Sequence, residues 1–293
     1  MASSTKESSG KLMSGKRGLV MGVANDRSIA WGIARTLADH GAELAFSYQG
    51  DSFGRRAVPL AESVGSKIIV PCDVSDIESV DNVFDAIAKQ WGSLDFVVHA
   101  LAFSDRTELR GRYAETSREN FIQTMVISCF SFTEVAKRAA ALMPDGGSLL
   151  TLSYAGSTRV VPCYNVMGVA KAALEASVRY LAADFGADGI RVNALSPGPM
   201  RTLAGAGISD ARVLFNYQRK HAPMKRTPTL DEVGGAALYL LSDLSGAVTG
   251  EVHFADCGYS ITAMPTLEEL KELDEDEPAG GKPASEPSAE AAQ

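Results

Sequence analysis

The sequence predicts an α/β protein of one domain, with a doubly wound parallel sheet of about seven strands. Short runs rich in Val, Ile and Leu alternate with longer segments in which apolar residues recur every three to four positions. This alternation is typical of strands buried on both faces by crossover helices. A chain of 293 residues with 45% hydrophobic content can form one large core, and no change of composition marks a linker between residues 17 and 265.

Each expected strand is a short apolar run with β-branched residues. The strands are expected at 17–22, 43–48, 67–72, 94–100, 147–153, 190–196 and 251–256. Between them, segments with helical spacing often end at Gly, as helices do. The helices are expected at 29–41, 80–92, 117–143 and 165–187.

The net charge of −8 is unevenly distributed along the chain, and most of the acidity lies in its last residues. Residues 266–293 carry a net charge of −7, whereas residues 1–17 carry +3. The last residues lack the aromatic and β-branched side chains that would offset the entropy of ordering. We therefore expect a flexible arm over 1–15, a folded domain over 16–265, and an acidic, disordered tail over 266–293 that keeps the chain soluble.

Four cysteines lie far apart with no C-x-x-C pair, so neither a metal site nor a disulfide framework is indicated. No apolar run approaches the roughly 20 residues needed to cross a bilayer. The first residues are polar rather than signal-like. These features predict a cytoplasmic protein, and we expect no metal, membrane or nucleic-acid partner.

The loop after the first strand, GVANDRSIAWGIA, begins at Gly22 and enters a helix through Ser28 and Ile29. Small residues before a helix N-terminus suit the pyrophosphate of a dinucleotide. The loop lacks the usual G-x-G-x-x-G pattern, and an Asn-Asp turn with Ser28 as the helix N-cap would explain most of it without a ligand. This stretch alone leaves both interpretations open.

The ends of the next strands supply further candidates, because ligands of open α/β sheets gather at the carboxyl ends. Gln49 follows the second strand with no immediate Lys or Arg, which favours NADH over NADPH, although Arg55 and Arg56 are near. Asp73, followed by Val74, is placed equally well to accept from an adenine amino group or to cap the next helix.

Two later strand ends add small or polar residues. His99 ends the fourth strand and is interpreted as a core or turn histidine, while Ala102 would let the backbone approach a ribose. After the sixth strand, a rigid turn leads through Met200 to Thr202, which can donate to a carboxamide or phosphate. The basic excess of residues 201–226 fits either an acidic partner or a solvated helix face.

The octapeptide YNVMGVAK places Tyr164 and Lys171 seven positions apart. On a helix, that spacing brings two side chains within about 20° of one face and about 10 Å apart along the axis. A nicotinamide ribose fits between them, with the Tyr164 phenol pointing at a substrate carbonyl. An exposed tyrosine and a solvated lysine would explain the octapeptide alone, but Tyr154 can bring a second phenol to the same pocket.

Together these residues resemble the short-chain dehydrogenase/reductase superfamily, which has a Rossmann-type fold. Within it they are most similar to the NADH-dependent enoyl-[acyl-carrier-protein] reductases of bacterial type II fatty acid synthesis. Ordinary members place the catalytic tyrosine four residues before the lysine, where this chain has Met167. The enoyl reductases instead have Tyr-x6-Lys, a second tyrosine ten residues upstream, and Gly-x5-Ser-x-Ala in the first loop. All three features are present in this chain. The resemblance spans residues 12–265.

The resemblance implies reduction of the trans-2 double bond of an enoyl thioester, presented by acyl carrier protein, with NADH as the hydride donor. Tyr164 would hydrogen-bond the thioester carbonyl, Lys171 would fix the cofactor ribose, and Tyr154 would border the substrate. The apolar acyl channel would be formed with the help of Met167, Met200 and Leu214. Residues 201–221 would form a mobile flap, and the family implies a homotetramer.

Two rival functions stay open on the sequence. A ketone-specific reductase of the same superfamily would require a tyrosine at position 167, which is Met167 here. A NAD-binding module without turnover would keep the fold, although the intact Tyr164 and Lys171 argue against it. Ala102 stands where many enoyl reductases have Gly, and its methyl group is tolerable if the backbone does not need a positive φ.

Overall fold

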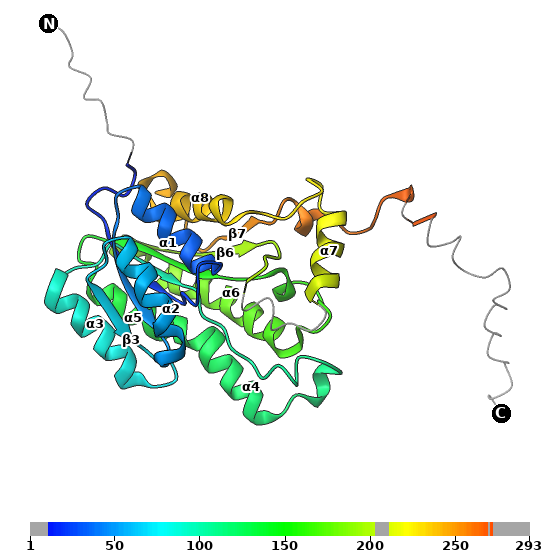
Figure 1. The fold of residues 1–293 in the computed structure, drawn as a ribbon, viewed down its shortest axis with the longest axis horizontal. Helices are drawn as coiled ribbons and strands as arrows, with labels where there is room; N and C mark the ends of the chain where they lie inside the picture. Colours follow the sequence, from blue (N-terminus) through cyan, green and yellow to red (C-terminus); the bar gives the residue numbers. More distant parts are fainter. Residues whose placement is uncertain (1–10, 203–210, 269, 272–293) are drawn as a thin grey trace, which may run out of the picture.

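One seven-stranded sheet forms the centre of the protein (Figure 1). The computed structural model describes residues 11–202, 211–268, 270 and 271. All neighbouring strands are parallel, in the order β3-β2-β1-β4-β5-β6-β7. The strands are β1 (Arg17–Met21), β2 (Glu43–Tyr48), β3 (Ile68–Pro71), β4 (Phe96–His99), β5 (Gly147–Leu152), β6 (Ile190–Pro197) and β7 (Val252–Ala255). The predicted fold class is confirmed.

Helices cover both faces of the sheet. They are α1 (Ile29–Asp39), α2 (Gly50–Ser63), α3 (Ile77–Trp91), α4 (Arg118–Met125), α5 (Ser131–Ala141), α6 (Asn165–Phe185), α7 (Ala211–His221) and α8 (Leu230–Leu241). Side chains of α1, α2 and α8 form one core with one face of the sheet, and those of α3, α5 and α6 form a second core with the other. Along β1, Val20 belongs to the first core and Leu19 and Met21 to the second, as the alternation of a strand requires.

The order of the strands reverses between β1 and β4. The chain proceeds from β1 through β2 to β3 at one edge, then returns to place β4 on the other side of β1. In open α/β sheets, ligands bind beyond the carboxyl ends of the strands at such a reversal. Gly22 and Ala100 follow the two central strands directly, so the expected crevice begins at these residues.

Three helical features differ from the sequence prediction. Helix α2 was not expected; its fully buried residues are the small Gly54, Ala57 and Ala61, and it contains Pro59, a residue that ordinarily ends a helix. Helix α8 was also missed. The long helix expected over 117–143 is instead α4 and α5, joined by a π-helical turn over Val126–Phe130.

The packed core begins earlier than the predicted domain boundary at residue 16. Met13 is 1% exposed, and its backbone N–H donates to the carbonyl oxygen of His40 at 3.0 Å. Most of the predicted acidic tail, and residues 203–210 of the predicted flap, lie outside the described residues. Within the part of the chain that the structure describes, no helix has both the length and the apolar character needed to cross a membrane.

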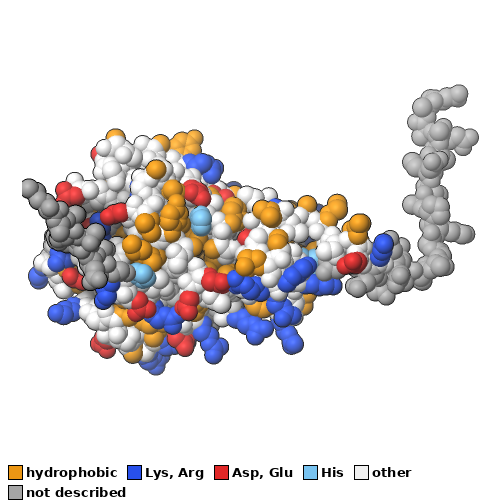
Figure 2. All heavy atoms as spheres, turned by 90° about the horizontal axis from the view of Figure 1, so that it is seen from above, with side chains coloured by type: hydrophobic (Ala, Val, Ile, Leu, Met, Phe, Trp, Pro, Cys, Tyr) orange, Lys and Arg blue, Asp and Glu red, His pale blue; other side chains and the backbone are white. Residues whose placement is uncertain are grey.

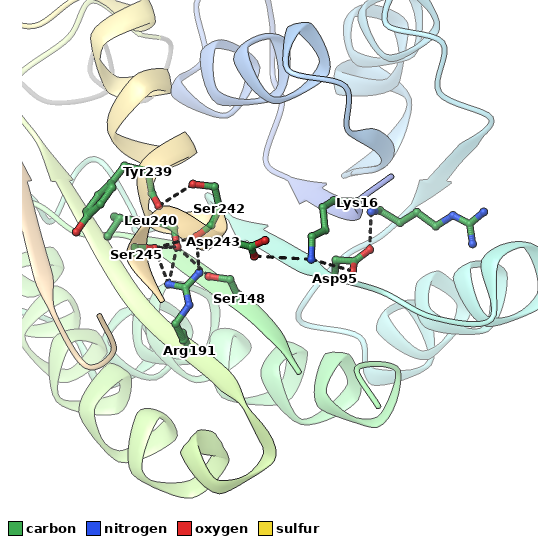
Figure 3. A network of polar contacts seen from close by, with 10 residues as sticks. Lys16, Asp95, Ser148, Arg191, Tyr239, Leu240, Ser242, Asp243 and Ser245 are labelled. Atoms are coloured by element: carbon green, nitrogen blue, oxygen red, sulfur yellow. Dashed lines mark hydrogen bonds and ion pairs between the residues drawn. The ribbon is translucent and has the colours of Figure 1, made fainter. Parts of the chain in front are cut away.

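A polar network joins the amino-terminal ends of the central strands, opposite the crevice (Figure 3). From β6, the Arg191 guanidinium donates to the carbonyl oxygens of Leu240 at 2.8 Å and Ser242 at 3.1 Å, at the end of α8. Ser148 of β5 donates to the same Leu240 oxygen at 3.1 Å. The network holds α8 against β5 and β6 at the amino-terminal ends of the strands. The functional site lies at the opposite, carboxyl-terminal ends.

Candidate active site

Gly22 brings the first loop close to the end of β4. Its φ is +101°, a conformation that L side chains rarely adopt, and a Cβ atom would lie 2.2 Å from the carbonyl oxygen of Ala100. Only glycine satisfies both conditions without displacing the backbone. The loop therefore crosses the strand ends with no side chain at this point, as a bound dinucleotide would require.

Ser28 is the N-cap residue of α1, but its side chain bonds to the preceding loop. Its Oγ accepts from the backbone N–H groups of Ala24 at 3.0 Å and Asn25 at 2.9 Å, and makes no side-chain cap on α1. Ser28 therefore occupies the N-cap position of α1, as the capping interpretation has it, but its side chain does not cap the helix. Helix α1 begins at Ile29 with its first amides not capped by the Ser28 side chain, and such amides together with the helix dipole favour an anion.

Gln49 and Asp73 are brought together from the ends of β2 and β3. The Gln49 amide donates to Asp73 Oδ2 at 2.8 Å, while Asp73 Oδ1 accepts from Ser75 N at 2.9 Å and Ser75 Oγ at 2.6 Å. The bonds from Ser75, then the bond from Gln49, hold the pKa of Asp73 below its usual range. The N-cap of α3 is Asp76, so the alternative in which Asp73 caps this helix is wrong. Val74, between them in the chain, is buried.

His99 has the environment expected of a core histidine, and Ala102 has an unstrained backbone. The His99 ring is completely buried between Thr151 Oγ1 at 3.1 Å and Ser131 Oγ at 2.9 Å, and burial lowers its pKa to about 3. His99 is therefore neutral. Ala102 is exposed and does not have a positive φ, so its methyl group introduces no backbone strain.

Tyr154, which is half-buried, and Tyr164, which is buried, form an aromatic pair after β5. Their ring centroids are 5.1 Å apart in an edge-to-face arrangement. Burial raises the pKa of both phenols, that of Tyr164 strongly. Both hydroxyls therefore stay protonated near neutral pH and are available as hydrogen-bond donors. Met167 is buried in the same small cluster as Tyr164.

Tyr164 is the N-cap residue of α6, so it does not share the helix with Lys171. The prediction that both side chains lie on one helix was wrong in this respect, because α6 begins at Asn165, directly after the tyrosine, and Asn165 has a positive φ of +32°. Tyr164 and Lys171 nevertheless lie on the same side of α6. A Cβ on Gly168 would lie 3.6 Å from the Tyr164 ring, and Gly168 is three positions before Lys171 on the same helical face.

Lys171 is a buried cation, only 5% exposed. Its Nζ donates to the carbonyl oxygen of Leu152 at 2.8 Å. Burial lowers its pKa to about 8, against the opposing influence of Cys129 and Glu175. Glu175, also buried, accepts a hydrogen bond from Ser153 Oγ. Glu175 was not predicted, although its position one helical turn after Lys171 is a signal that sequence reasoning can use.

Helix α7 covers the aromatic pair with residues from the predicted flap. Leu214 is half-buried on it, and Gln218, which was not predicted, donates to the Tyr154 hydroxyl at 2.6 Å. Before α7, Met200 packs against the core that contains α1, and the backbone N–H of Thr202 donates to the Met200 carbonyl oxygen at 2.8 Å. These residues extend the site from the first loop to the aromatic pair.

Comparison with known proteins identifies the family. The family model described as "Enoyl-(Acyl carrier protein) reductase" matches residues 22–260. The chain belongs to this family. It is 67% identical to "Enoyl-[acyl-carrier-protein] reductase [NADH] 2" of Rhizobium meliloti over 90% of this chain and 99% of the relative.

Solved structures of enoyl reductases have the same fold. FabI from Candidatus Liberibacter asiaticus is 58% identical, with a TM-score of 0.86 over 87% of this chain and 99% of that one. The reductase from Anaplasma phagocytophilum, described as a complex with NAD, is also 58% identical, with a TM-score of 0.85 over 88% of this chain and 98% of that one. The resemblance found in the sequence is confirmed.

Proposed function

We propose that this enoyl reductase uses NADH to reduce the trans-2 double bond of enoyl thioesters carried by acyl carrier protein, in the elongation cycle of fatty acid synthesis. The observation that carries the proposal is the aromatic pair of Tyr154 and the buried Tyr164 on the side of α6 that also holds Lys171. The identity to a relative named as an NADH-dependent enoyl reductase supports it.

The residues along the crevice fit NADH. Gly22 allows the first loop to lie close against the end of β4, and the N-terminal end of α1, which begins at Ile29 after Ser28, suits a pyrophosphate. The remaining proposed contacts are Gln49, Asp73, Val74, Ala102, Lys171, Met200 and Thr202. Asp51 and Arg55 line one hollow beyond β2, so a ribose 2′-phosphate there would meet a carboxylate as well as a guanidinium, which favours NADH over NADPH.

Bound NADH supplies the hydride that reaches the β-carbon of the substrate. Tyr164 donates a hydrogen bond to the thioester carbonyl and stabilises the negative charge that develops on its oxygen. Within the described residues, no side chain or backbone group is hydrogen-bonded to the Tyr164 hydroxyl. This hydroxyl can therefore donate to a ligand. Lys171 donates to the ribose hydroxyls, and Tyr154 borders the substrate and assists proton delivery.

The substrate enters beside α7. Met167 and Leu214 provide apolar surface for the acyl chain. In the view of Figure 2, Lys and Arg side chains gather along the lower edge of the molecule, several of them right of centre. Exposed basic residues on and around α7 are Arg201, Arg212, Arg219, Lys220 and Lys225. This surface fits an acidic face of the carrier protein.

A homotetramer in the cytoplasm completes the proposal. Large apolar side chains are exposed on the layer formed by α4, the π-helical turn and α6, and Tyr180 is 76% exposed. Phe130 and Ile122, each 54% exposed, lie on the same layer. Apolar groups gathered on one layer are typical of an interface between copies. Light scattering after size exclusion checks the assembly, and a monomer at micromolar concentration would contradict it.

Turnover with matched substrates tests the reaction. NADH absorbance is followed with crotonyl thioester and, separately, with simple ketones. We expect oxidation of NADH only with the thioester. Turnover with ketones alone would instead support the ketone reductase, and binding of NADH without turnover would support a cofactor-binding module.

A further inference from the structure

Gln218 is the most deeply buried side chain of α7. It is 3% exposed, whereas every other residue from Arg212 to His221 is exposed or half-buried. A surface helix normally buries an apolar residue at such a position. Burying an amide instead costs free energy unless the amide is hydrogen-bonded. The buried Gln218 amide therefore requires a hydrogen-bond partner.

That partner is a residue of the proposed active site. Gln218 Nε2 donates to the Tyr154 hydroxyl oxygen at 2.6 Å, a bond between residues 64 positions apart. Because the Gln218 amide donates to the phenol oxygen, the hydroxyl hydrogen of Tyr154 has to point away from Gln218. The ring of Tyr164 stands edge-to-face beside Tyr154.

The bond also changes how readily Tyr154 releases a proton. Burial raises the pKa of this phenol, the bond from Gln218 opposes that increase, and Tyr259 adds to it. A donor to the oxygen stabilises the phenolate more than the phenol. The titratable groups facing Tyr154 are thus Tyr164 and Tyr259, and Gln218 is the neutral group that favours ionisation.

We infer that Gln218 is a positioning residue, which acts through Tyr154 by orienting its hydroxyl toward the substrate for proton delivery. The inference rests on the proposed function. After hydride transfer, with NADH as the reductant, the substrate is an enolate. The Tyr154 O–H bond breaks, a C–H bond forms at the α-carbon, and the phenolate recovers a proton from solvent.

The first test replaces Gln218 by methionine, which has a similar size but no donor. With crotonyl thioester and NADH, we expect kcat of Gln218→Met to fall about tenfold, with the dissociation constant of NADH unchanged within about twofold. Tyr154→Phe should show at least the same loss, and the double variant should be no slower than Tyr154→Phe. Asn216→Met, an exposed position on the same helix, serves as the control and should keep wild-type rates.

A second variant separates positioning from a purely structural role. Gln218→Glu can donate to Tyr154 only when its carboxyl group is protonated, so its kcat should recover toward the wild-type value as pH falls. Wild-type kcat for Gln218→Met, losses that multiply in the double variant, or no recovery of Gln218→Glu at low pH would each overturn the inference. Absence of thioester turnover by the wild-type protein would instead contradict the proposed function.

Discussion

Replacing Gly22 by alanine tests whether the first loop needs its close approach to β4. Alanine at a φ of +101° is strained by about 1–3 kcal/mol. The new Cβ would also lie 2.2 Å from the Ala100 carbonyl oxygen, and relieving that overlap is expected to cost about another 1–3 kcal/mol. We therefore expect Gly22→Ala to lower the free energy of unfolding by about 4 kcal/mol, and to weaken NADH binding at least about tenfold.

The assay compares alanine variants at two glycine positions of the protein, Gly22 and Gly235. Urea unfolding is followed at a fixed protein concentration, since an oligomer's stability depends on it. NADH affinity is measured by fluorescence titration. Gly235, on the exposed face of α8, has no atom within 4 Å of an added Cβ and no positive φ, so Gly235→Ala should stabilise the protein by about 0.5–1 kcal/mol. A loss below about 1 kcal/mol for Gly22→Ala, with unchanged NADH affinity, would refute the reasoning.

The remaining predictions concern the two groups of the Tyr-x6-Lys motif. Tyr164→Phe should lower kcat with enoyl thioester by about 100-fold or more while keeping NADH affinity, because only the donor to the carbonyl is removed; an unchanged rate would remove Tyr164 from the mechanism. Lys171→Ala should raise the dissociation constant of NADH, as measured by titration. In the wild-type protein, the pKa of Lys171 is lowered to about 8, so its ammonium is present below pH 8 and is lost above it. NADH affinity should therefore decrease as pH rises through about 8, and this limb should be absent from Lys171→Ala.

The sheet could be predicted because its strands are short, nearly continuous apolar runs whose burial on both faces leaves a clear pattern. Helix α2 was missed because it contains Pro59, which ordinarily ends a helix, and its fully buried residues are only the small Gly54, Ala57 and Ala61. The early start of the core at Met13 was missed because one buried methionine in a polar segment forms no pattern.

The chemistry of the site was predictable from motifs, but its geometry was not. The spacing of Tyr164 and Lys171 identified the pair, yet the positive φ of Asn165 excludes Tyr164 from the helix. Ser28 was recognised as a helix-start residue, but its side chain serves the preceding loop. Gln218 had no signal, because its partner is 64 positions away and only the fold brings them together.

The strand order has a consequence for how the chain is synthesised. The first four strands to leave the ribosome, β1 to β4, are contiguous in space, and the last three complete the sheet on one side only. The nascent chain can therefore assemble the half that holds Gly22, Gln49 and Asp73 before the half with the tyrosine pair has been translated. Catalytic competence must then await α7, the last helix to supply a residue to the pocket.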